Sequence, residues 1–197
     1  AEDSFTVYAT RPIRHRGDTL SGPLLTVTFS APMADVIRAR LTHFAGGLPA
    51  KPEFQLFTEA VPVVITDNDA ETSLTSGKLA VHVPKTGDWR VEYRADGRVI
   101  TSSPPRGMGI MEVAGEGHFM HEQLALGVGE NVYGLGERFT AFVKNGQTVE
   151  LWNRDGGTSS DQAYKNIPFY LTNRGYGVFI NQPEQVSLEV AAEKVNR

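Results

Sequence analysis

Short runs of alternating apolar and polar residues dominate this chain, and glycine or proline separates most of them. Residues 35–42 show the pattern clearly, because Ile37, Ala39 and Leu41 alternate with polar side chains. A period of two places one set of side chains in a core and the other in solvent, as in an antiparallel strand. The same features predict further strands at residues 5–10, 24–29, 61–66, 79–83, 89–93, 169–172, 176–180 and 186–191.

Two dipeptides mark the tightest turns. Asp96-Gly97 and Asn145-Gly146 each lie between alternating runs, and both suit a two-residue hairpin turn in which both turn residues have positive φ. With Asn145-Gly146 at the turn, residues 138–152 form one predicted hairpin in which Phe142 lies opposite Val149. We therefore expect paired strands on either side of this turn.

Evidence for helices is weak. No window keeps apolar residues at positions i, i+3, i+4 and i+7, and residues 31–36 have room for one helical turn at most. Residues 102–109, which include Pro104 and Pro105, are expected to form a loop between two halves of one sandwich. The chain is thus predicted to have an all-β fold and to form a single domain over residues 1–197.

Composition excludes several classes of function. The chain has 197 residues and a net charge of −4, so nothing attracts it electrostatically to nucleic acid or to an anionic membrane. No apolar run reaches the ~18–20 residues that span a bilayer. The chain has no cysteine, which excludes disulfides and cysteine zinc sites and fits the cytoplasm, where we expect the protein. We predict no nucleic-acid or membrane partner and no cofactor.

A short Gly-x-Gly occurs in the run Gly134-Leu-Gly-Glu-Arg138. A phosphate-binding loop would need a third glycine and a following helix, whereas a strand is predicted to follow here. We interpret the glycines as residues that permit a tight bend. Glu137 and Arg138 are expected to form an ion pair that holds this bend.

The polar, glycine-rich loop at residues 153–161 is the best candidate for a binding site, because such loops on a rigid sheet collect binding residues. Asp155 can accept hydrogen bonds from sugar hydroxyls, and Arg154 can donate them. Trp152 and Tyr164 offer flat apolar surfaces beside the loop. Spacing alone leaves open the alternative of an ordinary loop in which Asp155 forms an Asx turn.

The histidines do not suggest a metal site. His118 and His121 are close in sequence, but side chains three residues apart on a strand point to opposite faces. No Gly-x-Ser-x-Gly motif occurs, so no nucleophile of that kind is assigned. We predict no metal ligands.

Three motifs together resemble one family. They are Glu-Asn-Val-Tyr-Gly-Leu-Gly-Glu-Arg-Phe at 130–139, Trp-Asn-Arg-Asp-Gly-Gly-Thr at 152–158 and Tyr-Lys-Asn-Ile-Pro-Phe-Tyr-Leu-Thr at 164–172. This stretch resembles the N-terminal β-sandwich of glycoside hydrolase family 31, most of all its bacterial α-xylosidases. The resemblance is dense from 124 to 189 and weaker from 5 to 103. It implies a large two-sheet antiparallel sandwich of the galactose-mutarotase-like kind.

The resemblance also implies a division of labour. In that family both catalytic carboxylates are aspartates of a (β/α)8 barrel that follows this domain, and nothing in this chain matches their motifs. We therefore assign no catalytic residue and expect this fragment of a longer chain to be inactive alone. In the family an N-domain loop with an Arg-Asp pair reaches over the active site of the barrel. Carried over, Asp155, with Arg154 and Gly156 beside it, would contact the substrate on its aglycone side.

Two other functions stay open at this point. The chain could be a free-standing carbohydrate-binding or interaction module, in which Trp152 stacks on a sugar. An aldose-epimerase-like enzyme would need a histidine and a carboxylate in one pocket, and the sequence does not show that pairing. The apolar face that a barrel would cover should promote self-association of the isolated chain.

Overall fold

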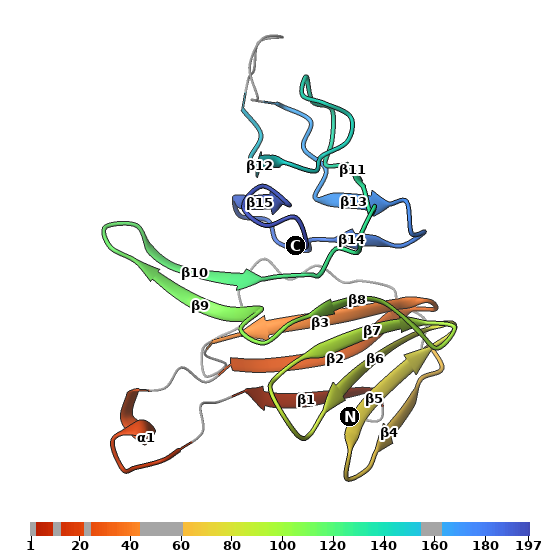
Figure 1. Ribbon diagram of the computed structural model, residues 1–197, viewed down its shortest axis with the longest axis vertical. Helices are drawn as coiled ribbons and strands as arrows, with labels where there is room; N and C mark the ends of the chain where they lie inside the picture. Colours follow the sequence, from red (N-terminus) through yellow and green to blue (C-terminus); the bar gives the residue numbers. More distant parts are fainter. Residues whose placement is uncertain (1–2, 10–12, 22–24, 44–60, 155–162) are drawn as a thin grey trace. The chain divides into compact units, whose positions relative to one another are not determined.

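We describe the protein from a computed structural model of the chain (Figure 1), in residues 3–9, 13–21, 25–43, 61–154 and 163–197. These residues form antiparallel sheets and one helix of four residues, and they divide into two compact units, 1–124 and 125–197. The predicted all-β fold is therefore confirmed. Each of the nine separate runs predicted as strands from alternation overlaps a strand of the structure, whereas the strand predicted at 138–144 does not form.

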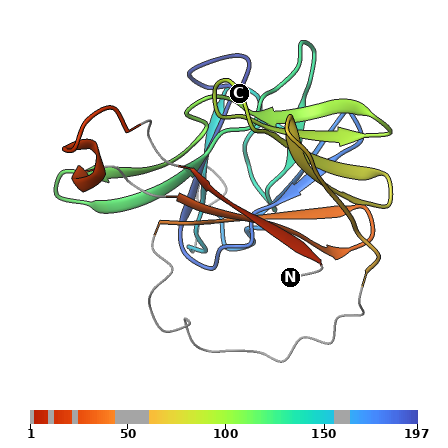
Figure 2. The same ribbon diagram turned by 90° about the horizontal axis from the view of Figure 1, so that it is seen from below.

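The first unit contains two sheets and a hairpin. The sheets have the strand orders β1-β2-β3 and β4-β5-β6-β7-β8, and β9 pairs with β10. Figure 2 shows the first sheet, in red to orange, as a layer beside the second, in yellow to green. The elements are β1 (Ser4–Ala9), α1 (Asp18–Ser21), β2 (Leu25–Met33), β3 (Val36–Thr42), β4 (Val64–Asp67), β5 (Glu71–Ser76), β6 (Leu79–Pro84), β7 (Val91–Ala95), β8 (Arg98–Ser103), β9 (Met108–Val113) and β10 (Gly117–Glu122).

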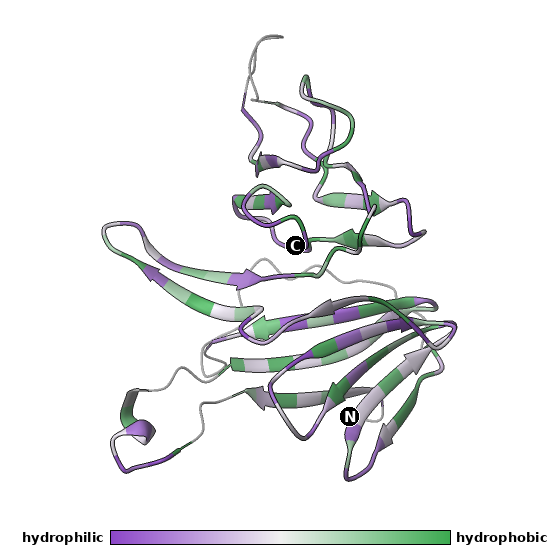
Figure 3. Cartoon of the chain, in the orientation of Figure 1, coloured by the Kyte–Doolittle hydropathy of each residue, from purple (hydrophilic) through white to green (hydrophobic). Residues whose placement is uncertain are grey.

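The two sheets of this unit form a sandwich around one core. Val27 and Phe29 from β2 are fully buried, and so are Leu74 of β5, Val81 of β6 and Val91 of β7. Strands β2 and β3 pack against β5 and β6 across the layers. Alternating hydropathy along these strands, visible in Figure 3 as green segments that alternate with pale or purple ones, explains why one face of each sheet is dry.

The second unit is smaller and has its own core. Its sheets have the orders β11-β13-β14 and β12-β15, again with antiparallel pairs. Val132, Leu135, Val149, Leu151 and Val190 are buried together with Tyr170. The strands are β11 (Val132–Gly134), β12 (Gln147–Leu151), β13 (Phe169–Thr172), β14 (Gly177–Phe179) and β15 (Val186–Val190).

The predicted hairpin at 138–152 is wrong. Strand β12 pairs with β15, so that Val149 lies opposite Leu188 rather than Phe142. The turn itself exists, because the Gln147 amide donates to the Lys144 carbonyl at 3.0 Å. Among the described residues with positive φ, however, only Gly146 of the dipeptide appears, and a type I′ hairpin turn needs positive φ at both positions.

Side-chain hydrogen bonds explain why residues 138–144 do not form a strand. The Asn145 side chain accepts from the Val132 amide and donates to the Glu130 carbonyl, both at 2.9 Å. Gln147 donates to the Val143 carbonyl at 2.6 Å. These bonds fix the segment against β11 and occupy backbone groups that a β-ladder would use.

The structure confirms one further predicted turn and differs from two other predictions about connecting segments. Asp96 and Gly97 both have positive φ and join β7 to β8, as predicted. Strand β2 continues to Met33, so no helical turn forms at 31–36. The expected loop at 102–109 shrinks to four residues between β8 and β9, and the division of the chain falls after Leu124 instead.

Candidate functional site

The loop that was predicted as the binding site is described only at its two ends. Asp155 and Gly156 lie in residues 155–162, outside the described part of the chain. Arg154 is described and exposed, and its amide donates to the Ala163 carbonyl at 3.0 Å. Asn153 and Ala163 also form a bridge between the two ends. The structure therefore holds the two ends of the loop side by side.

A pair of asparagines strengthens this stem. The Oδ1 atom of Asn153 accepts from the Asn166 amide at 3.1 Å and from the Asn166 Nδ2 atom at 2.9 Å. The same Nδ2 atom donates to the Ala163 carbonyl at 2.9 Å. Because three hydrogen bonds converge on two short side chains, the entry and exit of the loop are held in one geometry.

Arg138 ties the stem to the rest of the unit. Its guanidinium donates to the Leu135 carbonyl at 3.1 Å and to the Glu150 carbonyl at 2.6 Å. It also donates to Oδ1 of Asn166. The planar fork of an arginine can serve several acceptors at once. Arg138 thereby joins the glycine bend, strand β12 and the loop stem.

The glycine bend lies directly against the second end of the loop. Gly134, Leu135 and Gly136 all have positive φ, and the Glu137 amide donates to the Lys165 carbonyl at 3.0 Å. A Cβ atom on Gly136 would lie 2.2 Å from that carbonyl oxygen. The predicted tight bend is therefore confirmed, and its physical cause is a close backbone approach.

The ion pair expected between Glu137 and Arg138 is replaced by another. Glu137 lies 2.9 Å from the Nζ atom of Lys165, and both side chains are more than half exposed. The hydrogen bond that Lys165 donates to Glu137 raises the pKa of Lys165. An exposed pair of this kind adds little stability, so the hydrogen bonds of Arg138 and the close backbone packing at Gly136 hold the bend.

The two aromatic side chains beside the loop line different hollows, Trp152 a groove and Tyr164 a much smaller depression next to Glu137. Trp152 is 46% exposed and borders an open groove of about 320 Å³ that Pro168, Gln182 and Glu184 also line. Tyr164 is 55% exposed, and the Nζ atom of Lys165 lies 5.9 Å from its ring centroid. The structure thus separates the two rings that the sequence groups together.

The other candidate histidine and carboxylate residues do not come together in the described part of the chain. Within the described residues, no three histidine, aspartate or glutamate side chains come close enough to hold a metal ion. His121 on β10 lies 3.2 Å from the Arg106 carbonyl. Glu150 is exposed on β12 and accepts from Gln185 at 3.1 Å. Nor does any helix in the described ranges have the length and apolar character to cross a bilayer.

Sequence reasoning missed the residues that position the loop. These are Asn153, Asn166 and Arg138, whose residue types do not by themselves mark a site. Asn153 contacts Asn166 across 13 residues of sequence, and Arg138 contacts Asn166 across 28. One signal was present: an asparagine stands on each side of the glycine-rich loop. An asparagine amide can bond both strands of a loop stem.

Comparisons with known proteins agree with the resemblance in the sequence. The family model of the glycosyl hydrolase 31 N-terminal galactose mutarotase-like domain matches residues 26–189. The α-xylosidase XylQ of Lactiplantibacillus pentosus is 44% identical over 186 residues, which cover 94% of this chain and 24% of XylQ. An α-xylosidase of Emericella nidulans is 40% identical over 205 residues, covering 93% of this chain and 26% of that protein. The chain spans about a quarter of the length of these relatives.

Solved structures share the fold at low sequence identity. An α-xylosidase of this family from a soil metagenome, complexed with xylose, matches with a TM-score of 0.73 and 15% identity, over 98% of this chain and 29% of that one. A dextranase of the family from Flavobacterium johnsoniae, complexed with glucose, matches with a TM-score of 0.72 and 16% identity, over 99% of this chain and 24% of that one. The family model and the two α-xylosidases show that this chain belongs to glycoside hydrolase family 31, in the region of its N-terminal galactose mutarotase-like domain.

Proposed function

We propose that this chain is the non-catalytic N-terminal domain of a retaining α-glycosidase of the α-xylosidase or α-glucosidase type. In the whole enzyme it supports a catalytic (β/α)8 barrel and contributes the loop at 153–161 to the aglycone side of the substrate site. One carboxylate of the barrel attacks the anomeric carbon and a second protonates the leaving oxygen, with net retention. The isolated chain hydrolyses no glycoside. The lack of cysteine supports a cytoplasmic location for the enzyme.

The observation that carries the proposal is the fixed stem of the loop. Asn153, Asn166 and Arg138 hold its two ends with hydrogen bonds, and Gly136 lets the bend pack against one of them. A loop with a fixed stem presents its tip with a smaller loss of conformational entropy on binding. Such a stem supports a role in substrate contact for Asp155, which follows Arg154 directly in the sequence.

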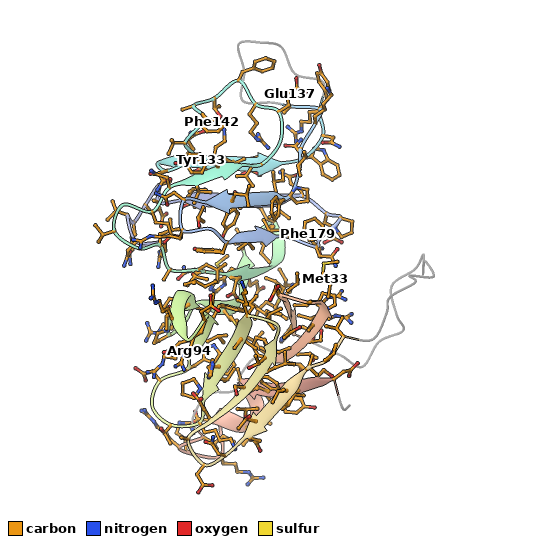
Figure 4. The ribbon with its side chains drawn as sticks, turned by 90° about the vertical axis from the view of Figure 1, so that its right-hand side faces the viewer. Met33, Arg94, Tyr133, Glu137, Phe142 and Phe179 are labelled. Carbon is orange, nitrogen blue, oxygen red and sulfur yellow. The ribbon has the colours of Figure 1, made fainter. Side chains whose placement is uncertain are left out.

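An apolar sheet face supports the role as a partner of the barrel. On the sheet β11-β13-β14, Phe169 lies opposite Phe179 and Leu171 lies opposite Tyr133. Phe169, Leu171 and Phe179 are 37%, 52% and 61% exposed, and the ring of Tyr133 lies 5.3 Å from that of Phe142 (Figure 4). Exposed apolar faces of this kind commonly mark interaction surfaces. We propose that the catalytic domain covers this one.

The test is Asp155→Ala in the whole enzyme. We expect kcat/KM to fall by a factor that depends on the aglycone, because the lost contact stabilises the leaving-group sugar rather than the reacting carbon. Kinetics with a series of aglycones on the same glycone measures this effect. The role of Asp155 is wrong if the variant matches the wild type on every aglycone.

A further inference from the structure

The groove beside Trp152 is a second feature of the smaller unit, and the proposed loop function does not use it. The groove lies where β12 ends and β15 begins. Leu151 and Val186, which lie opposite each other on these two strands, are among the residues that line it. Its volume of about 320 Å³ is at the lower end of the ~300–1,000 Å³ of small-molecule sites. That size suits one or two sugar rings better than a larger ligand.

The walls of the groove combine a flat apolar surface with amide groups and a carboxylate. Trp152 is half exposed on one side, and Pro168 lines it as well. Asn153, Gln182 and Glu184 supply amide and carboxylate groups. A sugar ring has an apolar face of C–H groups and a rim of hydroxyls, so it can stack on an indole and bond to amides at the same time.

Hydrogen bonds within the protein orient these polar groups in advance. The Oδ1 atom of Asn153 is occupied by Asn166, which fixes the amide and leaves its Nδ2 donor with no partner among the described residues. Gln182 donates from Nε2 to Oε2 of Glu184 at 2.8 Å. That bond leaves the Gln182 carbonyl oxygen and the second Glu184 oxygen as acceptors. The groove therefore offers one donor and two acceptors, which suits hydroxyls that both donate and accept.

Charge argues against other small ligands. No lysine, arginine or histidine lines the groove in the described structure, so a phosphate or a carboxylate would find no counter-charge there and would face Glu184. We propose that the groove binds a neutral saccharide, with its ring stacked on Trp152 and its hydroxyls bonded to Asn153, Gln182 and Glu184. This proposal does not rest on the role proposed for Asp155 in the loop at 153–161.

The test titrates the chain with methyl α-D-xyloside, methyl α-D-glucoside and isoprimeverose, by calorimetry and by saturation-transfer NMR. We expect Trp152→Ala to weaken binding at least about tenfold and Glu184→Gln to weaken it severalfold. Phe179→Ala is the matched control, because it removes an exposed ring outside the groove, and its binding should equal that of the wild type. Far-UV circular dichroism checks that each variant is folded.

Asp155→Ala separates the groove from the loop. Binding that survives in Asp155→Ala and is lost in Trp152→Ala supports the groove, whether or not the loop contacts the aglycone in the whole enzyme. Binding lost in Asp155→Ala but kept in Trp152→Ala overturns the groove and favours the loop. Absence of saturation transfer for all three sugars at tens of millimolar also overturns it. So does Trp152-dependent binding of a proline-rich peptide in place of the sugars.

Discussion

Replacing Gly136 with alanine should destabilise the smaller unit, because the backbone there leaves no room for a side chain. The residue has φ of +96°, and its Cβ atom would lie 2.2 Å from the Lys165 oxygen and 2.8 Å from the Ile167 nitrogen. Positive φ costs an alanine ~1–2 kcal/mol, and overpacking against Lys165 adds ~1–3 kcal/mol. The hydrogen bond from the Glu137 amide to the displaced carbonyl is worth ~1 kcal/mol. We expect the free energy of unfolding to fall by roughly 3–6 kcal/mol.

Gly146→Ala is the matched control for this experiment. Gly146 has φ of +83°, but no atom lies within 4 Å of the Cβ position, so its loss should be only ~1–2 kcal/mol from the backbone. Urea unfolding followed by the fluorescence of Trp152, in a Trp89→Phe background, reports on the unit that contains both glycines. Equal losses in the two variants would refute the argument that close packing against the loop stem requires Gly136.

Two further predictions concern other surfaces. A hydrogen bond from Arg94 holds the pKa of the Glu92 carboxyl below its ordinary value of 4.5. The stability that Glu92 adds is therefore fully present above pH 4.5, and it is lost as the pH falls through the folded-state pKa of Glu92. Glu92→Gln should cost about 1 kcal/mol at pH 7 and flatten the acid side of the pH–stability curve from urea unfolding; an unchanged slope contradicts this. Leu171→Lys should reduce self-association of the isolated chain in sedimentation velocity, whereas Val99→Lys, at a site 54% exposed on β8, should not. Identical sedimentation of wild type and Leu171→Lys would count against the apolar face.

The strands could be predicted because their signal is local. Alternation along β2, β3 and β6 follows from one dry face and one wet face, and each strand carries that pattern by itself. Strand β5 was missed because Leu74 is its one large apolar residue, although Ser73 and Ser76 are buried beside it. The predicted partner of β12 was wrong because its pairing with β15 depends on residues about 40 positions away, which no local pattern shows.

In the candidate site, too, some features could be predicted from the sequence and others could not. The family resemblance pointed to the loop and to Asp155, and the glycine bend could be read from Gly134 and Gly136. The stem could not be predicted, because Arg138 and Asn166 acquire their roles only when β12 and the bend meet. The exposed ring of Trp152 was recognised, but its groove needs Gln182 and Glu184, which lie before a strand on the opposite edge of the same small sheet.

The loop stem and the groove share one side chain, and this links the two proposals physically. Asn153 binds Asn166 through Oδ1 and thereby holds the stem, while its Nδ2 atom remains for a ligand in the groove. A saccharide that accepts from Nδ2 would restrict the same amide that fixes the loop, and linkage requires that each effect strengthen the other. Asp155→Ala changes only the loop and Glu184→Gln only the groove. If sugar binding in the groove stabilises the stem, then the protection of the Asn166 amide against hydrogen exchange should rise with ligand in Asp155→Ala and stay unchanged in Trp152→Ala.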